Sequence, residues 1–411
     1  MNPQLIAPQF QSKPAQRIAF DIGLFGFGCI GQGLWGVLNE TQGVTGRIAR
    51  ICVRQPDKAR PLDGHHFIFD ADQLLSSELP VVVELIDRAD DAWDIVREAL
   101  KRGKSVVSAN KKMIAEHFEE LIALQSETGA ALLYEGSACG SIPIIRNLEE
   151  YYDNDALTDL TAICNGTTNY ILSRMYREGS EFSQVLADAQ RLGFAESDPT
   201  LDIDGWDAKY KLLILTGHAF GLILRPEDIL NIGIRQVGAA DLAFAREKGL
   251  KIQLLARSYR RADGQVVSYV LPAFIDSSHP FFYVQDEFNA VSLTAAFAER
   301  QLFVGKGAGG YPTAAAVLSD LSALNHGYRY EYKKYQQDGQ AQQASDELLR
   351  VFFRFGTSNP FVESVEFDRI YIQYQSQGYN YLIGDLRLSH IFSLQDRFRS
   401  ESVLLALWPY D

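Results

Sequence analysis

The chain has 411 residues, of which 46% are hydrophobic and 22% are charged, and its formal net charge at pH 7 is −13. This length is enough for two or three domains with cores of their own, and the composition excludes wholesale disorder. The acidic balance argues against nucleic acid as a partner, because nucleic-acid binding needs a basic surface. No apolar run in the sequence approaches the roughly 20 residues of a membrane span, so no membrane contact is expected.

The cysteines and the N-terminal segment favour a cytoplasmic protein. The four cysteines are widely spaced and show no CxxC or Cys/His ligand spacing, so we expect reduced thiols in a reducing compartment. Residues 1–16 have no apolar core followed by a cleavage site. We therefore expect no secretory signal there and predict a short, loose lead-in.

Residues 17 to about 140 alternate between apolar strands and helices. Strands are predicted over residues 18–26, 47–53, 80–87, 105–110 and 130–136, and helices over residues 34–41, 91–103 and 111–129. Because strands that alternate with helices form parallel βαβ units, the pattern predicts a doubly wound sheet. We expect an α/β nucleotide-binding domain of the Rossmann type over residues 17–145, completed by a helix at about 311–330.

The pattern changes over residues 146–310. Helices are predicted over residues 170–176, 182–192 and 205–220, and strands over residues 159–164, 251–260, 266–275 and 289–297. Because the later strands follow one another with only turns between them, we expect an α+β domain with a mainly antiparallel sheet. The last segment, about residues 335–411, begins with the polar, linker-like run KKYQQDGQAQQASDE (residues 333–347) and contains strand-like stretches at 349–355 and 369–375, so we predict a small C-terminal α+β extension.

A glycine turn, GFGCIG over residues 26–31, follows the first predicted strand. Glycines there permit a tight turn and a close approach of the backbone to a pyrophosphate, and the helix that follows offers free N–H groups. A merely structural glycine turn is the alternative. The strand before the turn and the helix after it favour a dinucleotide site instead. The candidate cofactor-binding residues of this turn are Gly26, Gly28, Cys29, Ile30 and Gly31.

The end of the second predicted strand bears on the choice of cofactor. An acidic residue there binds the ribose 2′-OH of NAD, whereas an arginine accommodates the 2′-phosphate of NADP. Here Arg54 occupies that place, and Lys58 and Arg60 follow. The sequence therefore favours NADP over NAD, with use of both cofactors, or a solvated surface arginine, as the alternatives.

Five carboxylates are concentrated in residues 196–207, ahead of a long apolar helix. Asp207 and Lys211 are four residues apart, so they share one helix face. A lysine at the mouth of a buried helix, beside carboxylates, can exchange a proton with an alcohol or aldehyde oxygen, and the carboxylates can bind a substrate ammonium group. An ordinary surface ion pair is the alternative. A divalent cation site is a weaker one, because the spacing matches no calcium loop.

Two further polar elements follow predicted strands. Ser108 and Lys111 lie at the carboxyl end of a strand in the first domain, where ligands bind in open α/β sheets, so both are candidates for cofactor binding. The run NGTTN over residues 165–169 precedes a helix and offers amide and hydroxyl groups, which helix capping alone would also explain.

Six stretches of this chain together resemble the homoserine dehydrogenase family over residues 17–325. They are GLFGFGCIGQG, VVSANKKMIA, YEGSACGSIPIIRNL, ICNGTTNYILSRM, LGFAESDPTLDIDGWDAKYKLLIL and VGKGAGGYPTAAAVLSDL, in the order and spacing of the family. The resemblance implies a monofunctional enzyme, without an aspartate kinase domain, that interconverts L-aspartate 4-semialdehyde and L-homoserine with NAD(P) in threonine, methionine and isoleucine biosynthesis.

The resemblance also implies roles for individual residues. Lys211 matches the lysine that acts as acid and base at the reacting oxygen, Asp207 matches its neighbouring carboxylate, and Lys111 matches a lysine near cofactor and substrate. Gly307 lies in the run GKGAGG, which matches a glycine loop near the nicotinamide. The substrate-binding residues that the resemblance implies are Glu196, Asp202, Asp207 and Lys211.

A monovalent cation and a homodimer are further implications of the resemblance. The family binds a cation, usually sodium, through backbone carbonyls, so an Na+ or K+ site is expected, although Cys139 and Ser141 depart from the family's glycine-rich stretch. The second domain is expected to bind substrate and to form a homodimer, or a higher homo-oligomer, through its sheet. The matching cation positions are Glu135, Ala138, Gly140 and Ile142.

The C-terminal extension departs from the family. Many members carry a regulatory ACT domain there with a DxPG-type turn, and this sequence lacks that turn. We therefore expect either a degenerate ACT-like module or an accessory to the dimer.

Three other classes of protein compete with this interpretation. A Rossmann oxidoreductase of the glucose–fructose oxidoreductase type would carry an EKP-like motif at a strand end, where this chain has ANKK. A non-catalytic nucleotide sensor or a structural paralogue would be expected to lose its catalytic residues or its glycine turn. Lys211, Asp207, Glu196 and the turn are all intact.

Overall fold

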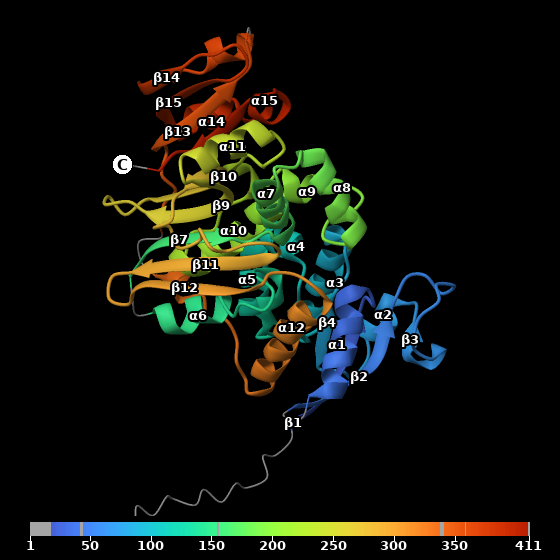
Figure 1. The fold of residues 1–411 in the computed structure, drawn as a ribbon. Coiled ribbons are helices and arrows are strands. Elements are labelled where there is room, and N and C mark those ends of the chain that lie inside the picture. The colour runs from blue at the N-terminus through green and yellow to red at the C-terminus, as the bar shows by residue number, and fades with distance from the viewer. Residues whose placement is uncertain (1–17, 42–43, 154–155, 338–340, 358, 410–411) are drawn as a thin grey trace, which may run out of the picture.

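The computed structural model of the chain describes residues 18–41, 44–153, 156–337, 341–357 and 359–409. The predicted lead-in at residues 1–16, and residues 338–340 of the predicted linker, lie outside these described residues. Two sheets organise the fold, and the N-terminal one (blue) lies at the far end of the molecule from the C-terminal strands (red) (Figure 1). No helix within the described ranges is long and apolar enough to cross a membrane.

The first sheet has six parallel strands in the order β3-β2-β1-β4-β5-β6, which confirms the predicted doubly wound arrangement. The order changes direction between β1 and β4, and the carboxyl ends of strands at such a point open a crevice for ligands. The strands are β1 (Ile18–Phe25), β2 (Val44–Cys52), β3 (Phe67–Ile68), β4 (Val81–Glu84), β5 (Ser105–Ser108) and β6 (Leu132–Leu133). The helices are α1 (Cys29–Glu40), α2 (Ala71–Leu75), α3 (Ala89–Lys101), α4 (Lys111–Glu116), α5 (Phe118–Thr128) and, from late in the chain, α12 (Gly310–Asn325).

The prediction of one helix over residues 111–129 was wrong, because His117 separates α4 from α5. The backbone of His117 leaves the helical region, with φ −120° and ψ 24°. Its imidazole stacks on the Trp93 ring of α3, with the ring centroids 3.9 Å apart. The helical pattern of the sequence continues through His117. A stacking contact with a different helix leaves no signal in that pattern, so the interruption could not be predicted.

The second sheet has the strand order β12-β11-β7-β9-β10-β16-β13-β15-β14, and β8 pairs with β10. Its strand pairings are antiparallel, apart from those that β10 makes with β8 and β16. The strands before the C-terminal segment are β7 (Leu157–Ile163), β8 (Leu230–Asn231), β9 (Lys251–Arg260), β10 (Val266–Ile275), β11 (Phe288–Ala295) and β12 (Glu299–Lys306). The helices are α6 (Ile145–Glu150), α7 (Gly166–Glu178), α8 (Phe182–Leu192), α9 (Thr200–Ile203), α10 (Trp206–Phe220) and α11 (Ala239–Glu247).

The C-terminal segment continues the second sheet, because its last strand, β16, lies between β10 and β13. Phe353 and Leu405 of this segment pack with Tyr269 and Leu271 of β10 in one buried cluster. The elements are α13 (Lys333–Gln336), β13 (Leu348–Phe355), β14 (Arg369–Tyr374), β15 (Asn380–Arg387), α14 (Leu388–Ser393), α15 (Gln395–Ser400) and β16 (Leu404–Leu407). Short 3-10 turns cover Gly64–His66, Glu135–Ser137, Tyr151–Asp153, Pro226–Asp228 and Pro360–Ser364.

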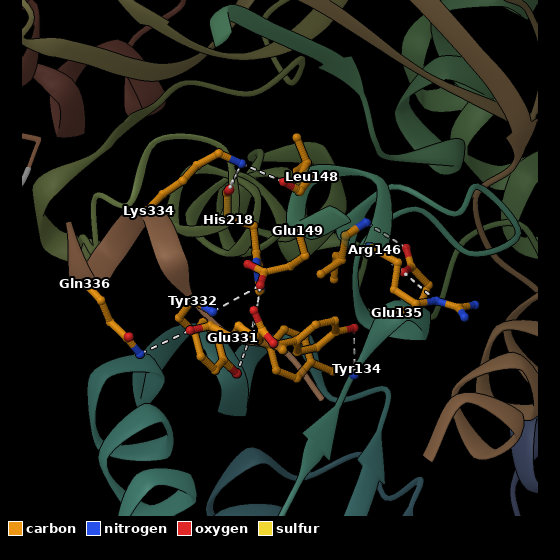
Figure 2. A network of polar contacts seen from close by, with 12 residues as sticks. Tyr134, Glu135, Arg146, Leu148, Glu149, His218, Glu331, Tyr332, Lys334 and Gln336 are labelled. Carbon is orange, nitrogen blue, oxygen red and sulfur yellow. Dashed lines mark hydrogen bonds and ion pairs between the residues drawn. The ribbon is translucent and has the colours of Figure 1, made fainter. Parts of the chain in front are cut away.

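Helix α10 is buried from Asp207 to Phe220, and the buried residues include the charged side chains of Asp207, Lys209 and Lys211. Near its C-terminal end, one ring nitrogen of His218 lies 2.6 Å from Glu149 Oε1 and the other lies 2.8 Å from the Tyr134 hydroxyl. Tyr134 follows β6 of the first sheet and Glu149 belongs to α6, so this polar network (Figure 2) joins α10 to the first sheet.

The beginning of the predicted linker also packs on this region. The Lys334 ammonium of α13 donates hydrogen bonds to the carbonyl oxygens of Leu148 at 2.5 Å and His218 at 3.1 Å (Figure 2). The polar run was predicted as a linker from its composition. Its first turn instead ties the end of α10 to α6, which helps to hold α10 in a fixed place.

Candidate functional site

The glycine turn between β1 and α1 has the geometry of a phosphate-binding loop. Gly26 has φ +91°, and a Cβ built on it would lie 2.4 Å from the carbonyl oxygen of Leu85. A Cβ on Gly31 would lie 2.7 Å from the Gly26 oxygen. Gly28 differs, because no described atom lies within 4 Å of a Cβ built there. Packing therefore requires two of these glycines, and the third leaves open space in front of the N–H groups of α1.

The glycine loop over residues 305–310 meets this turn. Cys29, which is exposed, and Ile30 begin α1. A Cβ on Gly310, at the start of α12, would lie 2.9 Å from the Cys29 carbonyl oxygen, so the beginnings of the two helices are in contact. Gly307 lies against the loop after β6, since a Cβ on Gly140 would lie 2.6 Å from the Gly307 carbonyl oxygen. The predicted nicotinamide loop is thus placed beside the glycine turn.

A cavity of about 540 Å³ lies next to the glycine turn, at the ends of β2 and β4. Arg54, Lys58 and Arg60 are among the residues that line it. Arg54 forms an ion pair with Asp91 of α3, which also lines the cavity. The open space at Gly28 and this cavity together fit a dinucleotide whose pyrophosphate lies at the turn and whose adenosine lies among basic side chains.

One carboxylate, that of Asp207, connects the two parts of the molecule. Its Oδ2 lies 2.8 Å from Lys211 Nζ on the same helix, and its Oδ1 lies 2.7 Å from Lys111 Nζ at the start of α4. Lys211 also donates a hydrogen bond to the carbonyl oxygen of Cys164 at 2.7 Å, just after β7. The side chains of Asp207 and Lys211 are 5% and 7% exposed, so this is not an ordinary surface ion pair. The structure therefore brings the three predicted catalytic residues into direct contact.

Burial and charge oppose each other at these groups. Burial alone would raise the pKa of Asp207, but the ammonium groups of Lys111 and Lys211 outweigh it and hold that pKa well below its usual range. Burial alone would lower the pKa of Lys211, but the Asp207 carboxylate outweighs it and raises that pKa above its usual value. Lys211 is therefore an ammonium group at neutral pH.

Asn165 holds two of the predicted substrate carboxylates together. Its Oδ1 accepts a hydrogen bond from the backbone N–H of Thr168 at 2.8 Å, which caps α7. Its Nδ2 donates to Asp202 Oδ1 at 2.7 Å and to Asp207 Oδ2 at 2.8 Å. Burial and the Asp207 charge raise the pKa of Asp202, so this amide offsets part of the cost of two adjacent carboxylates. The run NGTTN left both a cap and a further role for its amides open, and the partners of the second role could not be predicted because they are distant in the sequence.

Two predicted residues lie outside this cluster. Glu196 is exposed in the loop between α8 and α9, and no hydrogen bond or ion pair joins its side chain to the cluster within the described residues. Ser108 is fully buried, and its hydroxyl donates to Glu84 Oε2 at 2.6 Å and accepts from the backbone N–H of Asn110 at 3.1 Å. Ser108 therefore shapes the turn that presents Lys111.

The positions predicted to bind a cation form a buried turn after β6. Glu135, Ala138 and Ile142 are each at most 2% exposed, and Gly140 has φ +57°. The Glu135 carboxylate accepts the first two backbone N–H groups of α6, at 2.8 and 2.9 Å, so it is not free to bind an ion. The backbone carbonyls of these four positions are the ligands that the prediction assigns to the cation. Nowhere in the described chain are three or more His, Cys, Asp or Glu side chains grouped to hold a metal ion.

Comparisons with known proteins agree with this arrangement. A family described as "Homoserine dehydrogenase, NAD binding domain" matches residues 26–135, and "Homoserine dehydrogenase" matches residues 143–322. The homoserine dehydrogenase of Lactococcus lactis is 36% identical over 313 residues, which are 73% of this chain and 73% of that protein. The enzyme of Bacillus subtilis is 35% identical over 74% of this chain and 73% of its own length.

Solved structures show the same similarity. A homoserine dehydrogenase from Thiobacillus denitrificans has a TM-score of 0.82 at 28% identity, over 95% of this chain and 98% of that one. A hyperthermophilic archaeal homoserine dehydrogenase in complex with NADPH has a TM-score of 0.64 at 25% identity, over 76% of this chain and 99% of its own.

Proposed function

The chain belongs to the homoserine dehydrogenase family, and on that premise we propose that Lys211, Asp207 and Lys111 carry the proton transfer of its reaction. The reaction is the NAD(P)-dependent interconversion of L-aspartate 4-semialdehyde and L-homoserine, a step in threonine, methionine and isoleucine biosynthesis. The single observation that supports these roles best is the Asp207 carboxylate, which lies within 2.8 Å of both lysine nitrogens, one from each part of the molecule.

Proton donation by Lys211 follows from its charge and its place. When bound, the reduced nicotinamide supplies the hydride that adds to the aldehyde carbon. The aldehyde oxygen gains negative charge, and the Lys211 ammonium group stabilises that charge and gives its proton, directly or through one water molecule. The carbonyl of Cys164 and the Asp207 carboxylate orient the ammonium group beforehand. In the reverse direction, Lys211 must first lose its proton. The negative charge of Asp207 opposes that loss, and the ammonium group of Lys111 weakens the opposition because it is paired with the same carboxylate.

The substrate is held by carboxylates in this proposal. Asp202 and Asp207 lie side by side on Asn165, where they attract the α-ammonium group of the amino-acid substrate. Glu196 lies on the exposed loop that leads into this segment, and we propose that it adds a further carboxylate for the substrate.

The cofactor is held by the glycine turn of Gly26, Gly28 and Gly31, and we propose that NADP is preferred over NAD. Support comes from the neighbouring cavity, whose four basic side chains outnumber its three aspartates, and where Arg54 can pair with a 2′-phosphate once it leaves Asp91. From the family resemblance we also propose that a monovalent cation, Na+ or K+, is held by backbone carbonyls of the loop over residues 135–142, whose Glu135 carboxylate accepts two backbone N–H groups.

The cellular place and assembly are further proposals. The spacing of the cysteines, which are all free thiols in the structure, favours the cytoplasm. Membership of the family favours a homodimer, or a higher homo-oligomer, through the second sheet. Light scattering on the purified protein measures the assembly directly, and a monomer at micromolar concentration would contradict that proposal.

Steady-state oxidation of L-homoserine with each of NADP+ and NAD+ tests the proposed function. We expect turnover with a lower KM for NADP+, and we expect Arg54→Ala to raise the KM for NADP+ more than the KM for NAD+. Arg50→Ala is the matched control, because Arg50 lies on β2, four residues before Arg54, and bonds only its neighbour's carbonyl in the described structure. Equal KM values for the two cofactors, or equal effects of the two substitutions, would contradict the assignment of Arg54. Replacement of Na+ and K+ by tetramethylammonium tests the cation, and an unchanged rate would contradict it.

A further inference from the structure

An arginine of the C-terminal segment reaches the first turn of the catalytic helix. The guanidinium of Arg399, in α15, lies with its Cζ 5.0 Å from the centre of the Trp206 ring. The ammonium group of Lys209 lies 4.6 Å from the same ring centre. Trp206 is the first residue of α10 and immediately precedes Asp207. Two cations from different parts of the chain thus contact one aromatic ring beside the proposed substrate site.

Asn231 joins these residues through hydrogen bonds. Arg399 donates to the Asn231 backbone oxygen at 3.1 and 2.9 Å, and to Asn231 Oδ1 at 2.8 Å. Lys209 Nζ donates to the same Oδ1 at 3.1 Å. The Asn231 amide nitrogen donates to the backbone oxygen of Asp204 at 2.9 Å. Asn231 is fully buried, so the loss of a donor would leave a buried acceptor with fewer partners.

The segment held in this way is the one that bears the substrate carboxylates. Asp204 and Gly205 lie between Asp202 and Asp207, and Gly205 has φ +82° where α9 gives way to α10. The Asp204 carboxylate is also held by two hydrogen bonds from Arg235, at 2.8 and 3.0 Å. A shift of this short segment would therefore move both carboxylates together.

Arg399 is itself fixed from the C-terminal side. It donates to Asp396 Oδ1 and to Gln395 Oε1, each at 3.0 Å, and its backbone oxygen accepts from Gln236 Nε2 at 3.1 Å. Its side chain is only 19% exposed. Burial, followed by the charge of Arg399, lowers the pKa of Lys209 to about 8, which reflects how closely the two cations are held together.

We propose that Arg399 is a positioning residue for homoserine binding, which acts through Trp206 and Asn231 to set the place of Asp202 and Asp207. The C-terminal segment is thereby part of the substrate site and not a detachable extension. This proposal rests on the substrate roles proposed above for Asp202 and Asp207. It assigns no contact with the cofactor, because the glycine turn belongs to the other sheet.

The test compares Arg399→Gln with Arg397→Gln on the same helix. Arg397 stacks on Phe361, with its Cζ 4.3 Å from the ring centre, and bonds Ser364 and Glu401, all within the C-terminal segment. We expect Arg399→Gln to raise the KM for L-homoserine about tenfold, with the KM for NADP+ unchanged within about twofold, because a small misplacement of binding groups is costly. Arg397→Gln should keep both KM values.

Two further variants keep the result decisive. Arg399→Lys retains a cation near Trp206 but cannot make the paired hydrogen bonds to Asn231, so we expect a rise in homoserine KM of about threefold, even if Arg399→Gln does not fold. Asp202→Asn tests the underlying substrate assignment. If Asp202→Asn raises the homoserine KM while both Arg399 variants keep it within twofold of wild type, positioning by Arg399 is overturned. If Asp202→Asn also leaves it unchanged, the substrate assignment itself fails.

Discussion

Glu84 should make the protein less stable as pH rises toward neutrality. The side chain is fully buried at the end of β4, where its oxygens accept hydrogen bonds from Ser108 at 2.6 Å and from the backbone N–H of Ile86 at 2.7 Å. Burial outweighs these bonds and, with the nearby Asp87 charge, raises the pKa of Glu84 from 4.5 to about 7. The folded state therefore keeps a proton that the unfolded state releases.

The magnitude follows from the size of this shift. A carboxyl group whose pKa is raised on folding contributes stability that is complete below the unfolded pKa and is lost as pH rises through the folded pKa. The difference between 4.5 and about 7 corresponds to about 3 kcal/mol, of which about 2.5 kcal/mol is lost between about pH 5 and pH 8. Glu84→Gln is neutral at every pH and removes this loss.

Urea unfolding at about pH 5 and pH 8 measures the effect. The free energy of unfolding of Glu84→Gln, relative to wild type, should increase by about 2 to 3 kcal/mol between the two pH values. Glu127→Gln, an exposed position in α5, is the control and should show no such change. Wild-type and Glu84→Gln stabilities that stay parallel across this pH range would refute the assignment of a buried, protonated carboxyl group.

Two further predictions concern the glycine turn and the carboxylate pair. Gly28→Ala should leave the unfolding temperature within about 2 °C of wild type but raise the cofactor KM at least about tenfold, because the added Cβ meets only the space proposed for the pyrophosphate. Gly26→Ala should lower the unfolding temperature, because its Cβ would lie 2.4 Å from the Leu85 oxygen at a positive φ. A Gly26→Ala protein as stable as wild type would contradict the structural role of Gly26, and an unchanged cofactor KM in Gly28→Ala would contradict the binding role of Gly28. Asn165→Ala should raise the homoserine KM about tenfold or more, because two carboxylates lose their shared donor; isothermal titration with homoserine that shows wild-type affinity would contradict it.

Local patterns were sufficient for the parts of the fold and site that depend on neighbours in the chain. The spacing of Gly26, Gly28 and Gly31 after an apolar strand predicted the turn, because each glycine acts within a few residues of its position. The helical spacing of Asp207 and Lys211 predicted their contact in the same way.

Contacts between distant segments could not be read from those patterns. The ion pair between Lys111 and Asp207 depends on how the two sheets meet. The sequence around Lys111 gives no information about where Asp207 will lie. The place of β16 between β10 and β13 depends on the same kind of non-local pairing, so the C-terminal strands were expected in a separate extension. Ser108 shows the converse, since its position at a strand end indicated a ligand contact, whereas its hydroxyl is buried against Glu84.

The central claim is that the Lys211 ammonium group gives its proton to the oxygen that gains charge. The most direct test is the single-turnover rate at which the Lys211→Met protein, saturated with NADPH, oxidises that cofactor on mixing with L-aspartate 4-semialdehyde. If Lys211 is the proton donor, this rate falls by about 10² to 10⁴ relative to wild type, with NADPH affinity unchanged. A single-turnover rate within about threefold of wild type would show that another group protonates the substrate oxygen.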